Sequence, residues 1–150
     1  MKKIVLILLI IITSSLLLGS SCTQKQKADI SKAVCVYEAN TRGYFRKIIV
    51  QNQKVEVFAV RDSKESTITK ISDKDWKELL VLFKAAKLAD FPKYKDPTQK
   101  RFYDGAAIAN LSVKYQSKTY QTTDFDNGYP PVEIEKLVNK LLSLVKEKEE

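Results

Sequence analysis

The chain contains no histidine, and this absence excludes several kinds of chemistry at once. Ser-His-Asp triads and Cys-His pairs both need an imidazole that accepts and returns a proton. The commonest side-chain ligand of transition metals is missing for the same reason. The four glycines form no glycine-rich loop that could hold a phosphate group. We therefore expect a protein that is not an enzyme and that holds no cofactor and no metal.

The longest apolar run stands at the N-terminus, from Ile4 to Leu18, and only three hydroxyl residues interrupt it. Two lysines precede the run, and the small residues Gly19 to Ser21 follow it. A basic start, an apolar middle and a small-residue exit are typical of a secretory signal peptide. The run is shorter than the roughly 20 apolar residues that cross a bilayer, which favours a cleaved signal over a permanent span. Residues 1–21 are thus predicted to be a signal peptide.

The segment Leu18-Gly19-Ser20-Ser21-Cys22 resembles the lipobox of bacterial lipoproteins. Its leucine stands four residues before the cysteine, where the family has it three before. The resemblance covers only the leader and Cys22, and it implies that Cys22 becomes the acylated first residue of the mature chain. Two or more acyl chains, palmitate among them, hold a protein stably on a membrane. A soluble periplasmic product and an uncleaved anchor are the alternatives.

The same resemblance implies a destination in the cell envelope. Among such lipoproteins, Thr23 in place of an acidic residue implies delivery to the outer membrane. Gln24 to Lys27 lacks the acidic run that directs some lipoproteins to the cell surface, so we expect the protein to face the periplasm. Loss of the leader lowers the net charge from +8 to +6, and a secreted chain of this kind is not expected to bind nucleic acid.

Residues 22–32 are polar after the cysteine and are interpreted as the lipidated residue and a tether, and residues 33–150 as one domain. Cys35 lies within the apolar run Ala33 to Tyr37 and is predicted to be a buried, inert thiol. A disulfide is not expected, because the lipid occupies Cys22.

The rest of the chain alternates between strand and helix patterns. Residues 33–39, 44–50 and 54–61 are rich in β-branched and aromatic residues and predict strands, with a short further strand at 67–71. Ser72 is a good N-cap with Asp75 in the capping-box position, so a helix is predicted to begin there and to end at Phe91-Pro92. Its apolar stripe consists of Trp76, Leu79, Leu80 and Phe83.

A polar loop over 93–101 leads to a second group of elements. Residues 107–115 alternate between apolar and polar side chains and predict a half-buried strand that returns over 119–125. Pro131 is suited to the start of a second helix. The stripe of this helix consists of Ile134, Leu137, Val138, Leu141 and Val145. We predict an α+β fold, an antiparallel sheet of two hairpin-plus-helix units with both helices on one face.

Two loops are predicted to meet at one end of this sheet, because the start of one antiparallel strand lies beside the end of its partner. One loop holds Arg101 and Asp104, and the other holds Asp126, Asn127 and Tyr129. These five residues form our candidate binding surface. Arg101 is placed to reach Asp104, Asp124 or Asp126, and such a pair serves either to hold the loops together or to bind a ligand.

Three weaker patterns are interpreted as structural. Asp124 to Gly128 partly matches a calcium loop, but its glycine is fifth rather than sixth, which favours a strand-to-helix turn. Ser143 to Lys146 matches a Ser-x-x-Lys motif without its companion motifs. The basic and aromatic residues between Arg42 and Lys47 alternate along a strand, so half of them must face the core.

The sequence therefore supports a lipid-anchored envelope protein with a non-catalytic binding or structural domain and a partner protein in the envelope. The alternative is a periplasmic inhibitor or immunity protein that blocks a hydrolase or toxin, for which we expect a protruding loop over 93–101. An enzyme ranks third, and it would need the carboxylates of Asp104 and Asp126 to converge in a cleft.

Overall fold

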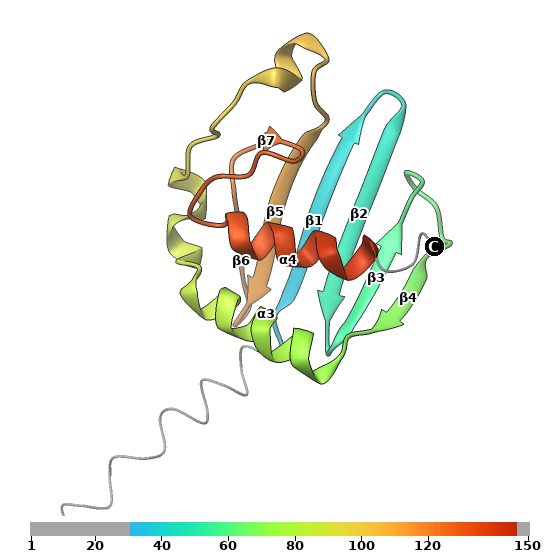
Figure 1. Ribbon diagram of the computed structural model, residues 1–150, viewed down its shortest axis with the longest axis vertical. Coiled ribbons are helices and arrows are strands. Elements are labelled where there is room, and N and C mark those ends of the chain that lie inside the picture. Colours follow the sequence, from blue (N-terminus) through green and yellow to red (C-terminus); the bar gives the residue numbers. More distant parts are fainter. Residues whose placement is uncertain (1–30, 147–150) are drawn as a thin grey trace, which may run out of the picture.

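The computed structural model describes residues 31–146 of the chain. The predicted signal peptide, Cys22 and most of the predicted tether lie outside the described residues. Within them, no helix combines the length and the apolar character that a bilayer span requires. The described residues form one antiparallel sheet with two helices packed against it, which confirms the predicted α+β class (Figure 1).

The sheet is built from a four-stranded meander to which a second group of strands is added. The meander runs β1, β2, β3 and β4, and β5 then pairs with the free edge of β1. The order across the sheet is β4-β3-β2-β1-β5-β6, and the short β7 pairs with β5. The strands are β1 Val34–Thr41, β2 Tyr44–Gln51, β3 Lys54–Phe58, β4 Thr67–Lys70, β5 Ile108–Tyr115, β6 Lys118–Gln121 and β7 Phe125–Asp126.

The first helix, α3 (Asp73–Ala85), begins where the capping signal predicts. The Ser72 hydroxyl accepts a hydrogen bond from the Asp75 backbone N–H at 3.1 Å. The helix ends earlier than predicted, because Ala86 is extended and the chain continues as a separate 3-10 helix, η2 (Leu88–Lys93). Pro92 lies inside η2 and donates no hydrogen bond there, because proline has no backbone N–H.

The second helix, α4 (Glu135–Lys146), crosses the same face of the sheet as α3 (Figure 1). It begins after a turn in which the Ile134 N–H donates to the Pro131 carbonyl at 3.1 Å, so Pro131 opens this turn rather than the helix itself. Lys140 connects the two helices, because its Nζ lies 2.7 Å from Asp75 Oδ1 and 2.6 Å from Glu78 Oε2. The predicted division into two hairpin-plus-helix units is only loosely met, because four strands and not two precede α3.

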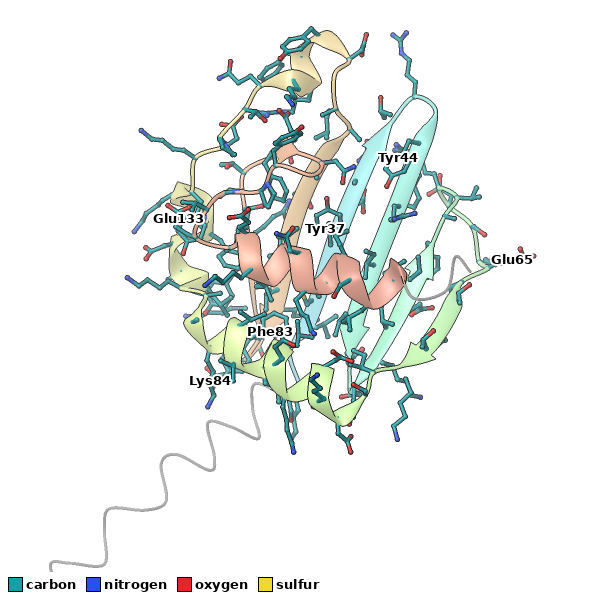
Figure 2. All side chains as sticks on the ribbon, viewed as in Figure 1. Tyr37, Tyr44, Glu65, Phe83, Lys84 and Glu133 are labelled. Carbon is teal, nitrogen blue, oxygen red and sulfur yellow. The ribbon has the colours of Figure 1, made fainter. Side chains whose placement is uncertain are left out.

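The hydrophobic core lies between the helices and one face of the sheet. Tyr37, Ile48 and Leu111 project from β1, β2 and β5 and are buried there, together with Leu79 and Phe83 of α3. Ile134, just before α4, and Leu137, Val138 and Leu141 of α4 are buried in the same core. Figure 2 shows Tyr37 and Phe83 on this helix-covered side, while Lys84 projects from the lower edge. The opposite sheet face is covered by no described helix.

Candidate binding surface

The two loops predicted to meet are joined by a single buried carboxylate, that of Asp126. This residue stands at the end of β7 and is fully buried. Its Oδ2 accepts hydrogen bonds from the Thr98 hydroxyl and from the Lys100 N–H at 2.6 Å. Its Oδ1 accepts from the Arg101 N–H at 3.1 Å and from the Arg101 guanidinium at 3.0 Å. The second loop is thereby tied to the first through four donors.

This set of donors changes the acidity of Asp126. Burial by itself would raise the pKa of the carboxyl group, because it disfavours the charged form. The hydrogen bonds from Thr98, from the two backbone N–H groups and from the guanidinium outweigh burial, and they lower the pKa to about 2. Asp126 is therefore ionised at neutral pH and has no proton to give.

Arg101 is itself held on several sides. Its side chain is 11% exposed, and its Nη1 also contacts Asp96 Oδ2 at 2.7 Å and the Thr98 carbonyl at 3.3 Å. The guanidinium carbon lies 4.5 Å from the centroid of the Phe102 ring. Of the three acids considered as partners, Asp126 is the one paired with Arg101, while Asp124 accepts a hydrogen bond from Asn110 at 3.3 Å. Asp96 was not among the predicted partners of Arg101, although Asp-Pro at 96–97 is a turn signal.

The other predicted surface residues lie around this pair. Asn127 Oδ1 accepts a hydrogen bond from the buried Tyr37 hydroxyl at 2.7 Å, so Asn127 links its loop to β1. Asp104 is exposed and ends the 3-10 helix η3 (Lys100–Tyr103) in the left-handed region, with φ of 58°. The Tyr129 ring lies 3.7 Å from Lys100 Nζ. Asp104 and Asn127 also line a shallow groove of about 310 Å³ beside Tyr44.

Beside the groove, η3 presents side chains that the sequence analysis did not single out. Phe102 and Tyr103 are each 71% exposed, and Tyr129 of the second loop is also exposed. We call these three residues the aromatic rim. In the sequence, the aromatic rim could have been recognised from the adjacent Phe102 and Tyr103, which stand between a polar loop and Gly105. Figure 1 shows that the segment carrying η3 projects beyond the upper end of β5.

Two of the groups considered for nucleophilic or acid-base chemistry, Cys35 and Asp126, are not available for it. Cys35 is completely buried, and burial raises the pKa of its thiol far above the usual value. Asp104 lines the groove, whereas the carboxylate of Asp126 is taken up by its four donors. Within residues 31–146, no cluster of three or more acidic or cysteine side chains could hold a metal ion.

The residues between Arg42 and Lys47 divide between the two faces of the sheet. Tyr44 packs against the core, while Phe45 and Lys47 line a hollow of about 350 Å³ on the uncovered face. Lys47 pairs with Glu38 at 3.7 Å, and the Arg61 guanidinium lies 5.5 Å from the centroid of the Phe45 ring. Of the charges of this hollow, Lys47 and Glu38 are thus paired with each other, while Arg61 lies against an aromatic ring.

Comparison with known proteins assigns neither a family nor a function to this surface. No protein-family model matches the chain, and no similar sequence is found among proteins of curated function. The class defined by the described residues is a small α+β domain with a protruding loop fixed by a buried ion pair.

Proposed function

We propose that the protein is a lipid-anchored envelope protein whose domain binds a partner protein through the aromatic rim. The anchor part rests on the leader and Cys22, and the binding part on Phe102, Tyr103 and Tyr129. One observation carries the binding proposal, namely that two largely exposed aromatic side chains sit on a loop tied to a buried carboxylate.

Aromatic residues are enriched at protein interfaces, and few residues supply most of the binding energy. Burying an exposed phenylalanine contributes roughly 1.5–3 kcal/mol. A loop that is already ordered loses less conformational entropy on binding than a mobile one. The four donors to Asp126 give this order to the segment that precedes Phe102. Together these features support binding of a protein rather than of a small ligand.

A photoreactive amino acid at position 103 tests the proposal in intact cells. We expect a discrete cross-linked product from this site and none from position 81, because Val81 is also exposed but lies on the outer side of α3. Phe102→Ala with Tyr103→Ala should lower recovery of that partner at least tenfold, because tenfold corresponds to about 1.4 kcal/mol and the loss of one buried aromatic side chain already reaches that value. The unfolding midpoint should not change, since both side chains are exposed.

The matched control is Ile68→Ala with Val81→Ala, which removes two exposed apolar side chains elsewhere. This control should recover the partner as wild type does. Equal recovery by the rim variant, or a cross-link that forms equally well from position 81, would contradict the binding proposal. Metabolic labelling with a fatty-acid analogue tests the anchor separately, and the label should be lost in Cys22→Ala.

The alternative, an inhibitor or immunity protein, is favoured by the projecting segment around η3. Inhibitors insert such a fixed loop into the active-site cleft of a hydrolase or toxin. The two functions differ in what the captured partner is and in what binding does to it. An equimolar complex in which the partner's hydrolytic activity falls would favour the inhibitor, whereas a partner whose activity is unaffected would favour the binding module.

A further inference from the structure

The end of the domain opposite the aromatic rim is rich in lysine. The antiparallel pairing brings the start of β1, the turn from β2 to β3, the end of β4 and the turn from β5 to β6 to this end. The helix α3 runs along it (Figure 1). We call the following exposed residues the basic end: Lys32, Lys54, Lys70, Lys84, Lys87 and Lys118.

The acids near the basic end do not neutralise it. Asp75 and Glu78 are both paired with Lys140 of α4. Asp73 accepts a hydrogen bond from the neutral Gln53 at 2.6 Å and keeps its charge, but one carboxylate offsets only one of the six lysines. No lysine of the basic end forms an ion pair with another described residue. At the opposite end, by contrast, Arg101 is paired with Asp96 and Asp126. The domain therefore presents an uncompensated positive charge at one end.

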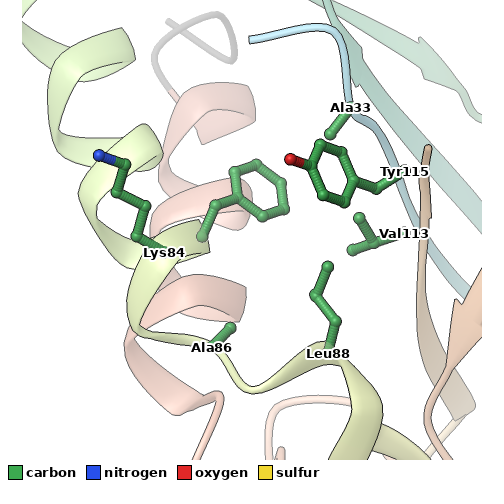
Figure 3. Close-up of a pocket in the computed structure, with 7 residues that line it drawn as sticks. Ala33, Lys84, Ala86, Leu88, Val113 and Tyr115 are labelled. Atoms are coloured by element: carbon green, nitrogen blue, oxygen red, sulfur yellow. The ribbon is translucent and has the colours of Figure 1, made fainter. Parts of the chain in front are cut away.

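A mainly apolar hollow of about 350 Å³ lies beside Lys84 of the basic end. It is lined by Ala33, Phe83, Leu88, Val113 and Tyr115, with Lys84 beside them (Figure 3). Ala33, Phe83 and Val113 are buried, so the hollow offers little apolar surface, and the basic side chains are the part of this end that suits a charged lipid headgroup.

The course of the chain also connects this end to the membrane. Ala33 lines the hollow, and only the ten residues 23–32 separate it from Cys22. At the maximum extension of about 3.3–3.6 Å per residue, these ten span no more than about 35 Å. An acyl chain on Cys22 would thus keep the basic end, where Ala33 lies, within about 35 Å of the membrane surface.

We propose that the basic end docks on the anionic headgroups of the membrane that holds the anchor, which turns the aromatic rim away from that membrane. This inference rests on the proposed lipid anchor. Clusters of lysine are attracted to negatively charged lipid surfaces over about one Debye length, close to 10 Å at moderate salt. The short tether keeps the domain within reach of the surface, so weak charge attraction suffices to orient it.

The test uses the mature, lipidated full chain in vesicles of phosphatidylcholine, with or without phosphatidylglycerol. A brief pulse of an amine-acylating reagent is applied, and modification of each lysine is read by peptide mass spectrometry. We expect the rates at Lys84, Lys87 and Lys118 to fall roughly fivefold with phosphatidylglycerol and to recover in high salt. Lys64, in the loop between β3 and β4 at the other end, should react equally in both vesicles.

A pair of variants with the same change in charge sharpens the test. Lys84→Gln with Lys118→Gln should weaken the protection of Lys54 and Lys70. Arg42→Gln with Lys64→Gln, at the opposite end, should leave that protection unchanged.

Three results would overturn the inference, and they are distinguishable. Vesicle-bound protein whose lysines react equally in both lipids would show that the basic end does not dock. Protection by a soluble polyanion such as heparin, but not by anionic vesicles, would assign this end to another class of partner. A mature protein whose mass lacks acyl chains would contradict the anchor itself, and the docking inference would fall with it.

Discussion

Replacing Asp126 by Asn tests whether this carboxylate holds the segment that carries the aromatic rim. Asn has nearly the same shape but carries no charge, and its amide group donates where one carboxylate oxygen accepts. Of the four donors, only the Thr98 hydroxyl can turn to offer a lone pair. At least one N–H of Lys100 or Arg101 would then lose its acceptor in a buried site.

Two estimates of the cost agree in size. A buried donor without an acceptor costs about 1–3 kcal/mol. The fall of the Asp126 pKa from 3.8 to about 2 corresponds to about 2.5 kcal/mol in favour of the charged form. The two quantities describe the same hydrogen bonds and do not add, so we expect Asp126→Asn to lower the free energy of unfolding by about 2–3 kcal/mol. For a domain of this size, the midpoint of thermal unfolding should fall by about 10–15 °C.

Urea unfolding at neutral pH, followed by the fluorescence of the single tryptophan, Trp76, measures this change. The matched control is Asp124→Asn, because Asp124 is exposed and accepts one hydrogen bond, from Asn110 at 3.3 Å. Its effect should stay within about 0.5 kcal/mol. A loss below about 1 kcal/mol in Asp126→Asn, or an equal loss in both variants, would refute the assignment of Asp126 as the residue that joins the loops.

The same variant has a pH signature. Because the native pKa of Asp126 is lower than its unfolded value, its charge stabilises the fold fully above about pH 4 to 5. This contribution is lost as the pH falls through the native pKa near 2. The difference in unfolding free energy between wild type and Asp126→Asn should therefore narrow between pH 5 and about pH 2. A difference that stays constant across this range would contradict the lowered pKa.

Three further changes test other parts of the same end and the core. Tyr37→Phe removes the 2.7 Å hydrogen bond to Asn127 and should lower the free energy of unfolding by about 1 kcal/mol in urea; an unchanged value would refute the link. Gly128→Ala should lower the free energy of unfolding by about 1–2 kcal/mol, because the φ of Gly128 is +88°. Gly43→Ala is the control, since an added Cβ meets no close neighbour at either glycine, and it should leave the free energy of unfolding nearly unchanged. Equal effects of the two substitutions would contradict this backbone explanation. Cys35 should react with a thiol reagent only after unfolding, read by peptide mass spectrometry, and fast labelling of the native protein would contradict its burial.

Much of the architecture could be predicted from short-range patterns. The N-cap at Ser72 is confirmed because a capping hydroxyl acts on an N–H three residues away. The alternation along β5 is confirmed because Ala109, Leu111 and Val113 are the buried residues of that strand. The stripe of α4 is confirmed for the same reason, apart from Val145, which is only partly buried.

The candidate surface was predictable only in part. The meeting of the two loops follows from strand pairing, so the sequence could place Arg101 near Asp126. It could not indicate that backbone N–H groups of Lys100 and Arg101 would point at the same carboxylate, because η3 has no capping or periodic signal of its own. Whether the surface binds a partner is still a prediction that the proposed cross-linking tests.

Patterns among neighbouring residues were enough to predict the start of α3 and the alternation along β5, and they carry the signal-like character of the leader. Only the tertiary structure determines which charged side chains form ion pairs and which do not. It paired Arg101 with Asp96 and Asp126, paired Lys140 with the acids of α3, and left the lysines of the basic end without ion-pair partners among the described residues. The physical reason is that ion pairing depends on distances of a few ångströms between segments far apart in the chain, which no local pattern encodes.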